Sequence, residues 1–114
     1  PYSLELRKIA KEKAKKLDIK YVEGVYAGFM GPYYETKAEI RMIKTMGSDA
    51  VGMSTVPETI VSNYLGLNTL AFATITNMAT GIQTQKHSHE NVVRVAKIAS
   101  RKLADWIKEV VKEL

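Results

Sequence analysis

Apolar residues recur every three or four positions near the start of the chain, which is the spacing that places them on one face of an α-helix. Ser3 stands just before this pattern, where a serine hydroxyl can accept a hydrogen bond from the first turn. The pattern predicts an amphipathic helix over residues 3–17. The following stretch, IKYVEGVYAG, is rich in β-branched and aromatic side chains and predicts a strand that ends at Gly28.

A second helix is predicted from its first residues. Thr36 and Glu39 have the spacing of a capping box, in which each side chain bonds the free backbone N–H of the other residue. The helix should run to Met46 and stop before Gly47, a residue type common after helix ends. A short strand, Ala50–Gly52, is expected next.

The last part of the chain repeats these signals. Thr55 and Glu58 predict a second capping box and a helix that ends at Gly66. The stretch NTLAFATIT, residues 68–76, is almost continuously apolar and predicts a strand buried on both faces of a sheet. Apolar residues at helical spacing over 92–114 predict a long closing helix.

The predicted order of elements is α-β-α-β-α-β-α. Strands that alternate with helices indicate an α/β fold with a mainly parallel sheet flanked by helices on both faces. Neither a repeat nor a linker interrupts the 114 residues, which are enough for one compact domain. We therefore expect a single α/β domain over residues 1–114.

Composition narrows the class of protein. Hydrophobic residues make up 46% and charged residues 25%, as in average soluble globular proteins. No apolar run is long enough to span a bilayer, and the first residues lack the pattern of a signal peptide. The chain contains no cysteine, which excludes disulfides and thiolate metal sites. The expectation is a cytoplasmic protein without a membrane partner.

Lysines near the start of the chain account for much of the net charge of +5. They alternate with apolar residues at helical spacing, which favours a solvated helix face over a nucleic-acid-binding patch. Interleaved aromatic residues, which single-stranded nucleic acid would need for stacking, are missing there. We expect no nucleic-acid partner. The lysines are Lys8, Lys11, Lys13, Lys15 and Lys16.

Candidate chemistry lies where the predicted strands end, because ligands of open parallel sheets bind beyond the carboxyl ends of the strands. The three junctions read GFMGPYYE, GMST and TNMATG. Gly28, Gly31 and Gly52 permit either close approach of a ligand or tight turns. The junctions carry no dinucleotide, triphosphate or serine-hydrolase motif.

Tyr33, Tyr34 and Glu35 offer a site for a planar ligand. A phenol ring can stack on a heteroaromatic ring whose N–H groups donate to a carboxylate. The alternatives are that the tyrosines are core residues and that Glu35 only complements the helix dipole. Asn77 can present a donor and an acceptor to the same ring, although asparagine also forms turns.

The remaining candidates concern an anion, a sugar and a metal. Ser54 stands at a predicted helix start, where free N–H groups favour phosphate, while Thr55 is expected to be the N-cap. Met53 can contact a sugar face or fill the core. His87 and His89 lie in a polar stretch, but further ligands at zinc spacing are missing, so we expect no metal.

These motifs together resemble a known family. The segment GPYYETKAEIRMIKTMGSDAVGMSTVPETIVSNYLGL, followed by TITN and HENV, is similar to the C-terminal half of the trimeric purine nucleoside phosphorylases. The resemblance covers nearly the whole chain. It implies that the 114 residues are the C-terminal portion of a longer phosphorylase. The first half of the family pattern, which carries a Gly-rich phosphate loop and further phosphate ligands, has no counterpart in this sequence.

The resemblance implies a role for each matched residue. Tyr34 would pack on the purine, Glu35 would accept its ring N–H, and Asn77 would bind the 6-oxygen and N7 as the catalytic donor. Ser54 would bind phosphate. The substrate-binding residues implied in this way are Tyr34, Glu35, Gly52, Met53, Thr76, Asn77 and His89, of which Met53 and His89 would contact the ribose.

The implied reaction is phosphorolysis of 6-oxopurine nucleosides such as inosine and guanosine, with inorganic phosphate as co-substrate and no cofactor. The implied partner is a further copy of the chain, as in the family trimer, or a complementary N-terminal half. Three alternatives stay open: a non-catalytic purine-binding module, a self-associating α/β fragment, and an enzyme similar to methylthioadenosine phosphorylase.

Overall fold

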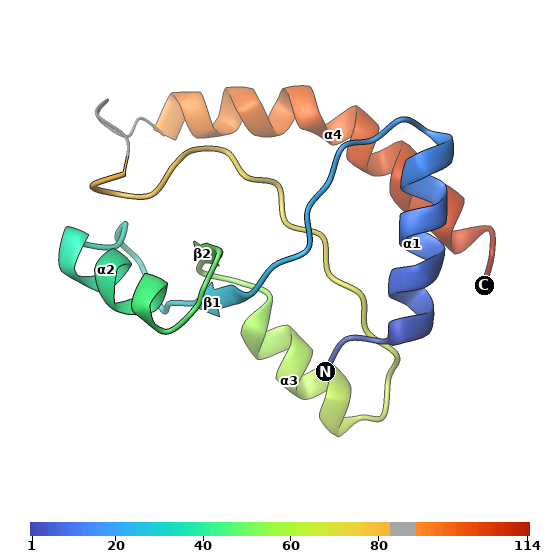
Figure 1. Ribbon diagram of the computed structural model, residues 1–114, viewed down its shortest axis with the longest axis horizontal. Coiled ribbons are helices and arrows are strands. Elements are labelled where there is room, and N and C mark those ends of the chain that lie inside the picture. The colour runs from blue at the N-terminus through green and yellow to red at the C-terminus, as the bar shows by residue number, and fades with distance from the viewer. Residues whose placement is uncertain (83–88) are drawn as a thin grey trace.

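A computed structural model describes residues 1–82 and 89–114 and has an α/β fold (Figure 1). These residues form four helices and two strands, which confirms the predicted α/β class, although no strand separates the last two helices within the described part. In chain order the elements are α1 (Leu4–Lys16), β1 (Tyr26–Gly28), α2 (Lys37–Thr45), β2 (Ala50–Gly52), α3 (Val56–Tyr64) and α4 (His89–Val111).

The two strands form a small parallel sheet. Tyr26 pairs with Ala50, and Gly28 pairs with Gly52. Beyond the last pair, the Phe29 N–H donates to the Gly52 carbonyl at 2.9 Å, so the backbones stay together as the strands end. Helix α3 packs against β1. The carboxyl ends of both strands therefore lie side by side.

The predicted strand over 68–76 does not form. This segment runs from α3 toward α4 (yellow in Figure 1) without a strand assignment. Its side chains are not buried on two faces, since Ile75 is 57% exposed. A strand exists only where a neighbour offers backbone N–H and C=O groups, and no described segment forms such a ladder with 68–76. An apolar run of this kind is buried on both faces only where further strands flank it, and the described residues supply none.

The first predicted strand is shorter than expected for the same reason. Residues 19–25 have strand-like composition, but β1 contains three residues because its partner β2 also contains three. Asp49 takes over the pairing just before the strand: its carboxylate accepts from the Val25 N–H at 2.8 Å, and its own N–H donates to the Val25 carbonyl at 2.8 Å.

The best-packed contact joins α1 to α4. Ala10, Ala14 and Val110 are buried between the two helices. The Trp106 indole N–H donates to the Ala10 carbonyl at 2.8 Å, and the Trp106 ring packs edge-on against Phe72 with 4.7 Å between centroids. These contacts fix the closing helix, whose extent agrees with the prediction from its apolar spacing.

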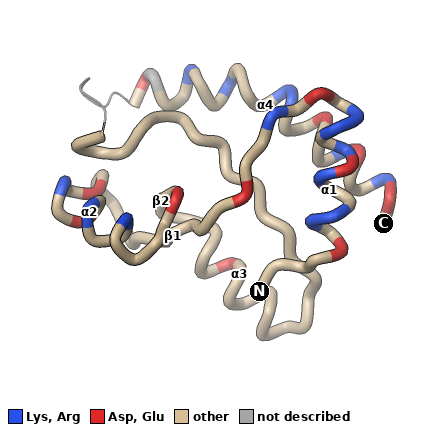
Figure 2. Tube along the Cα trace, viewed as in Figure 1, with Lys and Arg blue, Asp and Glu red and all other residues tan. Residues whose placement is uncertain are grey.

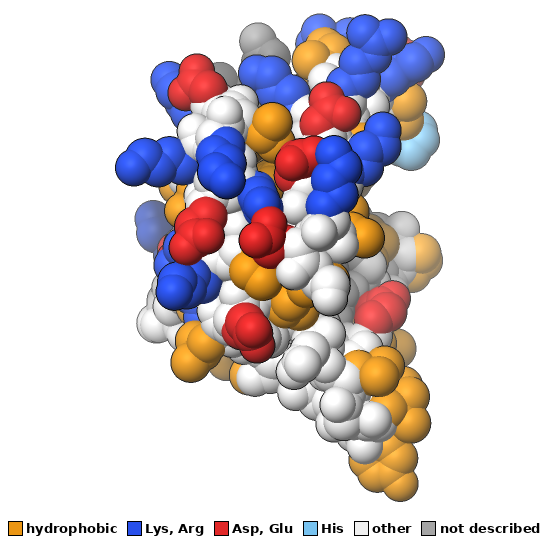
Figure 3. Space-filling model, turned by 90° about the vertical axis from the view of Figure 1, so that its right-hand side faces the viewer, with side chains coloured by type: hydrophobic (Ala, Val, Ile, Leu, Met, Phe, Trp, Pro, Cys, Tyr) orange, Lys and Arg blue, Asp and Glu red, His pale blue; other side chains and the backbone are white. Residues whose placement is uncertain are grey.

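Charged side chains concentrate on α1 and α4 (Figure 2), and the face over this end of the molecule mixes both signs (Figure 3). Lys13 departs from the solvated face predicted for the lysines. It is 8% exposed and forms an ion pair with Glu113. That hydrogen bond raises the pKa of Lys13 and lowers the pKa of Glu113. No helix in the described part of the chain is long and apolar enough to cross a membrane.

Candidate active site

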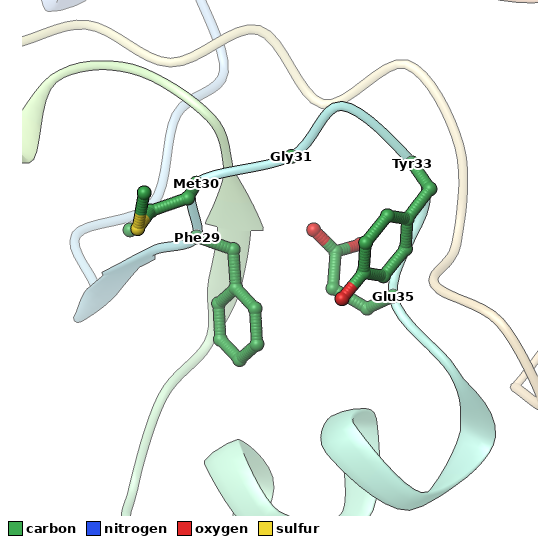
Figure 4. Close-up of a pocket in the computed structure, with 6 residues that line it drawn as sticks. Phe29, Met30, Gly31, Tyr33 and Glu35 are labelled. Atoms are coloured by element: carbon green, nitrogen blue, oxygen red, sulfur yellow. The ribbon is translucent and has the colours of Figure 1, made fainter.

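Two cavities open at the carboxyl ends of β1 and β2. The smaller has a volume of about 320 Å³ and lies on the turn after β1 (Figure 4). The larger has a volume of about 850 Å³ and reaches from that turn across the end of β2 to the start of α4. The smaller cavity is lined by Gly28, Phe29, Met30, Gly31, Tyr33 and Glu35.

Glu35 is the buried acid of this region. It is 8% exposed and lines both cavities. No fully buried side-chain oxygen among the described residues lacks a hydrogen-bond partner, so the Glu35 carboxylate is open to the cavities and can accept hydrogen bonds from a ligand there. This position differs from the alternative considered above, in which Glu35 merely complements the helix dipole from the surface.

The capping box of α2 holds Glu35 in place. Adjacent Thr36 accepts a hydrogen bond from the Glu39 N–H at 3.2 Å, and its own N–H donates to Glu39 Oε2 at 2.7 Å. The prediction of this capping box from the sequence is confirmed. The hydrogen bonds from the Thr36 N–H and hydroxyl lower the pKa of Glu39, so the box contains a carboxylate at neutral pH.

Both tyrosines of the turn line the larger cavity. Tyr33 is 61% exposed and Tyr34 is 45% exposed, so neither is a core residue. The Tyr33 ring stands beside the Glu35 side chain in Figure 4. The family resemblance assigned a role only to Tyr34, yet Tyr33 lines the smaller cavity as well. The adjacent positions alone could not distinguish which ring approaches Glu35.

Met53 brings the end of β2 against the turn after β1. A Cβ atom at Gly31 would lie 2.6 Å from the Met53 sulfur, and Gly31 has a φ of +66°, so only glycine fits there. Gly52 also lines the larger cavity. Its missing side chain is replaced by the Tyr26 hydroxyl, which would lie 2.1 Å from a Cβ atom. Close contact within the chain therefore explains both glycines.

Ser54 lies next to this site but is not among the residues that line either cavity. Thr55, which follows it, is not the predicted side-chain N-cap of α3, so the second capping box is wrong. The φ of Thr55 is +75°, and the Val56 N–H donates to the Ser54 carbonyl at 2.8 Å. This tight γ-turn directs the Thr55 hydroxyl toward Ser54 Oγ, 3.3 Å away, instead of toward the helix.

The third group of candidates enters the larger cavity from the opposite side. Thr76, Asn77 and His89 all line it. Asn77 donates one amide N–H to the Thr76 hydroxyl at 3.0 Å, which leaves its second N–H and its carbonyl oxygen for other partners. His89 is the first residue of α4. His87, which the family pattern did not match, lies outside the described residues.

The larger cavity thus collects residues from segments far apart in the sequence. Seven of the predicted site residues line it, whereas Ser54 does not. Within the described ranges there is no cluster of three acidic or histidine side chains that could hold a metal ion. The seven are Tyr34, Glu35, Gly52, Met53, Thr76, Asn77 and His89.

Fold and site define an α/β protein whose ligand cavity lies beyond the carboxyl ends of parallel strands. The family model of the phosphorylase superfamily matches residues 1–112, and the chain belongs to that family. The chain is 43% identical over 113 residues to purine nucleoside phosphorylase 1 of Geobacillus stearothermophilus. It is 42% identical over 112 residues to a Moorella thermoacetica protein named "Probable 6-oxopurine nucleoside phosphorylase".

Comparison with solved structures supports the same family. A Schistosoma purine nucleoside phosphorylase in complex with hypoxanthine superposes with a TM-score of 0.93 at 32% identity, over 99% of this chain and 42% of that one. The chain spans 41% of the Geobacillus relative's length and 43% of the Moorella relative's length. The resemblance inferred from the motifs is therefore confirmed, and it concerns less than half of each relative.

Proposed function

We propose that this chain supplies the purine-binding side of a phosphorylase site that cleaves 6-oxopurine nucleosides with inorganic phosphate. The products are the free base and ribose 1-phosphate. The observation that carries the proposal is that Glu35, an acidic residue only 8% exposed, lines the same cavity as Asn77. Related proteins named as purine nucleoside phosphorylases support the substrate class.

Glu35 reads the N1 edge of the base in this proposal. A 6-oxopurine carries a hydrogen on N1, whereas adenine has a lone pair there, which a carboxylate would repel. The carboxylate therefore favours inosine and guanosine over adenosine. Hydrogen bonds to charged groups contribute about 1.5–3 kcal/mol, enough for a discrimination of roughly tenfold to a hundredfold.

Asn77 acts on the leaving group. Phosphate attacks the anomeric carbon, the bond from that carbon to N9 breaks, and the electron pair of that bond passes to the purine. Negative charge then grows on the base, toward the 6-oxygen and N7. The second N–H of the Asn77 amide donates to that charge, and the hydrogen bond to Thr76 supports this role by orienting the amide. A donor oriented in advance stabilises the transition state more than the ground state.

The other residues position the nucleoside. Tyr34 packs on the purine, while Met53 and His89 contact the ribose, and all three line the same cavity. Ser54 binds the phosphate beside the start of α3. A single hydroxyl binds a phosphate dianion only weakly, so further phosphate ligands must come from elsewhere in the assembled protein.

The assembled protein contains more than this chain in our proposal. The chain acts as a single α/β domain that corresponds to the C-terminal portion of a longer cytoplasmic phosphorylase. Either further copies, as in a trimer, or a complementary N-terminal half complete the site. The unpaired apolar segment 68–76 supports a missing neighbour, because such a run is typical of a strand inside a sheet.

Phosphorolysis of inosine tests the proposed function. The purified chain is incubated with inosine in phosphate buffer, alone and with an added N-terminal half of the Geobacillus relative, and hypoxanthine release is followed. Phosphate-dependent release in either mixture supports the proposal. Release from 5′-methylthioadenosine but not from inosine would instead favour the methylthioadenosine alternative, and no release in either mixture would contradict a phosphorylase.

A further inference from the structure

The turn that carries Ser54 has a backbone conformation that few residues adopt. Thr55 has a φ of +75° and a ψ of −49°, and the Val56 N–H donates to the Ser54 carbonyl at 2.8 Å. These angles are close to those of the γ-turn with positive φ, which is rare because it is strained. Such a turn persists only where neighbouring groups hold it. The contacts around Thr55 therefore decide where the Ser54 hydroxyl lies.

Thr59 makes two of these contacts. Its hydroxyl donates to the Thr55 carbonyl at 2.6 Å, in addition to the ordinary helical bond from its N–H at 2.9 Å. Thr59 is 7% exposed, so little water competes for this hydroxyl. A valine would fill the same space but could not make the extra bond. The hydroxyl of Thr59, and not its shape, therefore acts on the turn.

The first residues of the chain hold Thr59 from its other side. The Tyr2 hydroxyl hydrogen-bonds Thr59 Oγ1 at 3.4 Å. The Asn63 amide, one turn further along α3, donates to the Pro1 carbonyl at 3.0 Å and to the Thr59 carbonyl at 2.8 Å. Residue 1 thus lies against α3, as Figure 1 shows. A series of hydrogen bonds runs from Tyr2 through Thr59 to the turn beside Ser54.

We propose that Thr59 is a positioning residue for Ser54 and that Tyr2 supports it. The inference rests on the function proposed above, in which Ser54 binds inorganic phosphate. Thr59 does not touch phosphate in this proposal. It fixes the Thr55 carbonyl, and with it the turn that keeps the Ser54 and Thr55 hydroxyl oxygens 3.3 Å apart. A group held in place before binding loses less conformational freedom on binding, so the affinity is higher.

Kinetics of the assembled protein distinguish positioning from folding. Wild type, Thr59→Val and Thr59→Ser are each combined with the N-terminal half of the Geobacillus relative, and KM is measured for phosphate and for inosine. Thr59→Val should raise KM for phosphate by about threefold to tenfold, the effect of one net hydrogen bond, and leave KM for inosine within about twofold. Thr59→Ser keeps the hydroxyl and should restore the wild-type values. A merely structural role would lower the apparent kcat without changing either KM.

Thr45→Val is the matched control. The Thr45 hydroxyl makes the same kind of bond in another helix, α2, where it donates to the Arg41 carbonyl at 2.9 Å. Its loss should leave both KM values within about twofold of wild type. Tyr2→Phe should raise KM for phosphate less than Thr59→Val does, because the contact between Tyr2 and Thr59 is the longer one.

Backbone amide NMR signals report phosphate binding without turnover. Inorganic phosphate is titrated into the isotopically labelled chain, with and without the N-terminal half, and the signals of Ser54 and Thr55 are followed. The wild-type signals should shift at lower phosphate concentrations than those of Thr59→Val.

The outcomes separate the positioning role from the proposed function. Equal phosphate dependence in wild type and Thr59→Val would overturn the positioning role, even where hypoxanthine is released. Wild-type signals that do not respond to phosphate would overturn it together with the role of Ser54. A weaker phosphate response in Thr59→Val without any hypoxanthine release would support the positioning role and contradict the proposed function.

Discussion

At the scale of single residues, the proposed function divides the recognition of a purine between Glu35 and Asn77. Glu35 is a buried acceptor, and Asn77 keeps one free N–H and a carbonyl oxygen after its bond to Thr76. Because the 6-oxygen and N7 of a 6-oxopurine both accept hydrogen bonds, the free N–H of the amide can donate to either of them. The proposed preference for 6-oxopurines would therefore depend on the chemistry of two side chains and not on the shape of the cavity alone.

Replacing the Asn77 amide by a carboxylate should reverse part of this preference. Asn77→Asp accepts a hydrogen bond from a 6-amino group and repels a 6-oxygen. We expect the ratio of kcat/KM for adenosine to that for inosine to rise by about tenfold or more in the assembled enzyme. Asn68→Asp, at an exposed position, is the matched control. An unchanged ratio would contradict the role assigned to Asn77.

The fold holds Thr55 in a backbone conformation that a β-branched residue rarely adopts. A β-branched residue with a φ of +75° is strained by about 1–3 kcal/mol. The Thr59 hydroxyl and N–H both donate to the Thr55 carbonyl, at 2.6 Å and 2.9 Å, and so keep the turn in place. The capping-box motif in the sequence could not reveal this, because local spacing does not report backbone angles.

Relief of this strain should stabilise the protein. Thr55→Gly adopts a positive φ freely, so we expect the free energy of unfolding to rise by about 1 kcal/mol in urea denaturation. Thr45→Gly, in the last turn of α2, is the control and should lower it by a similar amount. A large loss of stability in Thr55→Gly would mean that the threonine side chain, and not the backbone, holds the turn.

At the scale of elements, the helices and the short parallel strand β2 were predictable, whereas the length of β1 and the fate of segment 68–76 were not. Helix bounds follow from local signals, and Ser3, Thr36 and Gly47 mark the ends of α1 and α2 as expected. Strands depend on partners that are remote in sequence. The segment 68–76 has the composition of a central strand but lacks a ladder among the described residues, and no local pattern could have predicted that.

The capping box of α2 makes the stability of the protein depend on pH, because it contains the carboxylate of Glu39. The pKa of Glu39 is lower in the folded protein than its ordinary value of 4.5. The contribution of Glu39 to folding stability is therefore fully present above pH 4.5 and is lost as the pH falls through the lower, folded-state pKa. Glu39→Gln should therefore unfold more easily than wild type at pH 7, and the difference should shrink in acid. Thermal unfolding at a series of pH values measures this, and a constant difference would contradict the assignment.

At the scale of the whole molecule, the chain is open. Its radius of gyration of 15.3 Å exceeds the value of about 13 Å typical of a compact domain of this length. Many large apolar side chains are exposed, among them Ile60, Tyr64 and Leu65 on or just after α3. The length of the chain predicted one compact domain, but length and composition do not report how many apolar residues a chain of this topology can cover.

Exposed apolar surface of this extent should drive association. We expect the mass from light scattering to exceed the 12.7 kDa of one chain and to rise with concentration. Ile60 and Tyr64 lie on one face of α3, so Ile60→Lys combined with Tyr64→Lys should lower the mass. Lys8→Ala combined with Lys15→Ala on α1 is the control. A constant mass of 12.7 kDa would contradict association.

The most direct test of the account is whether Glu35 reads the N1–H of a 6-oxopurine. Hypoxanthine and adenine are titrated into the wild-type chain, Glu35→Gln, and Glu58→Gln as a control from the first turn of α3. We expect the wild-type chain and the control to prefer hypoxanthine. Glu35→Gln should lose about tenfold to a hundredfold in affinity for hypoxanthine and little for adenine. Equal losses for both bases, or none for either, would contradict the account.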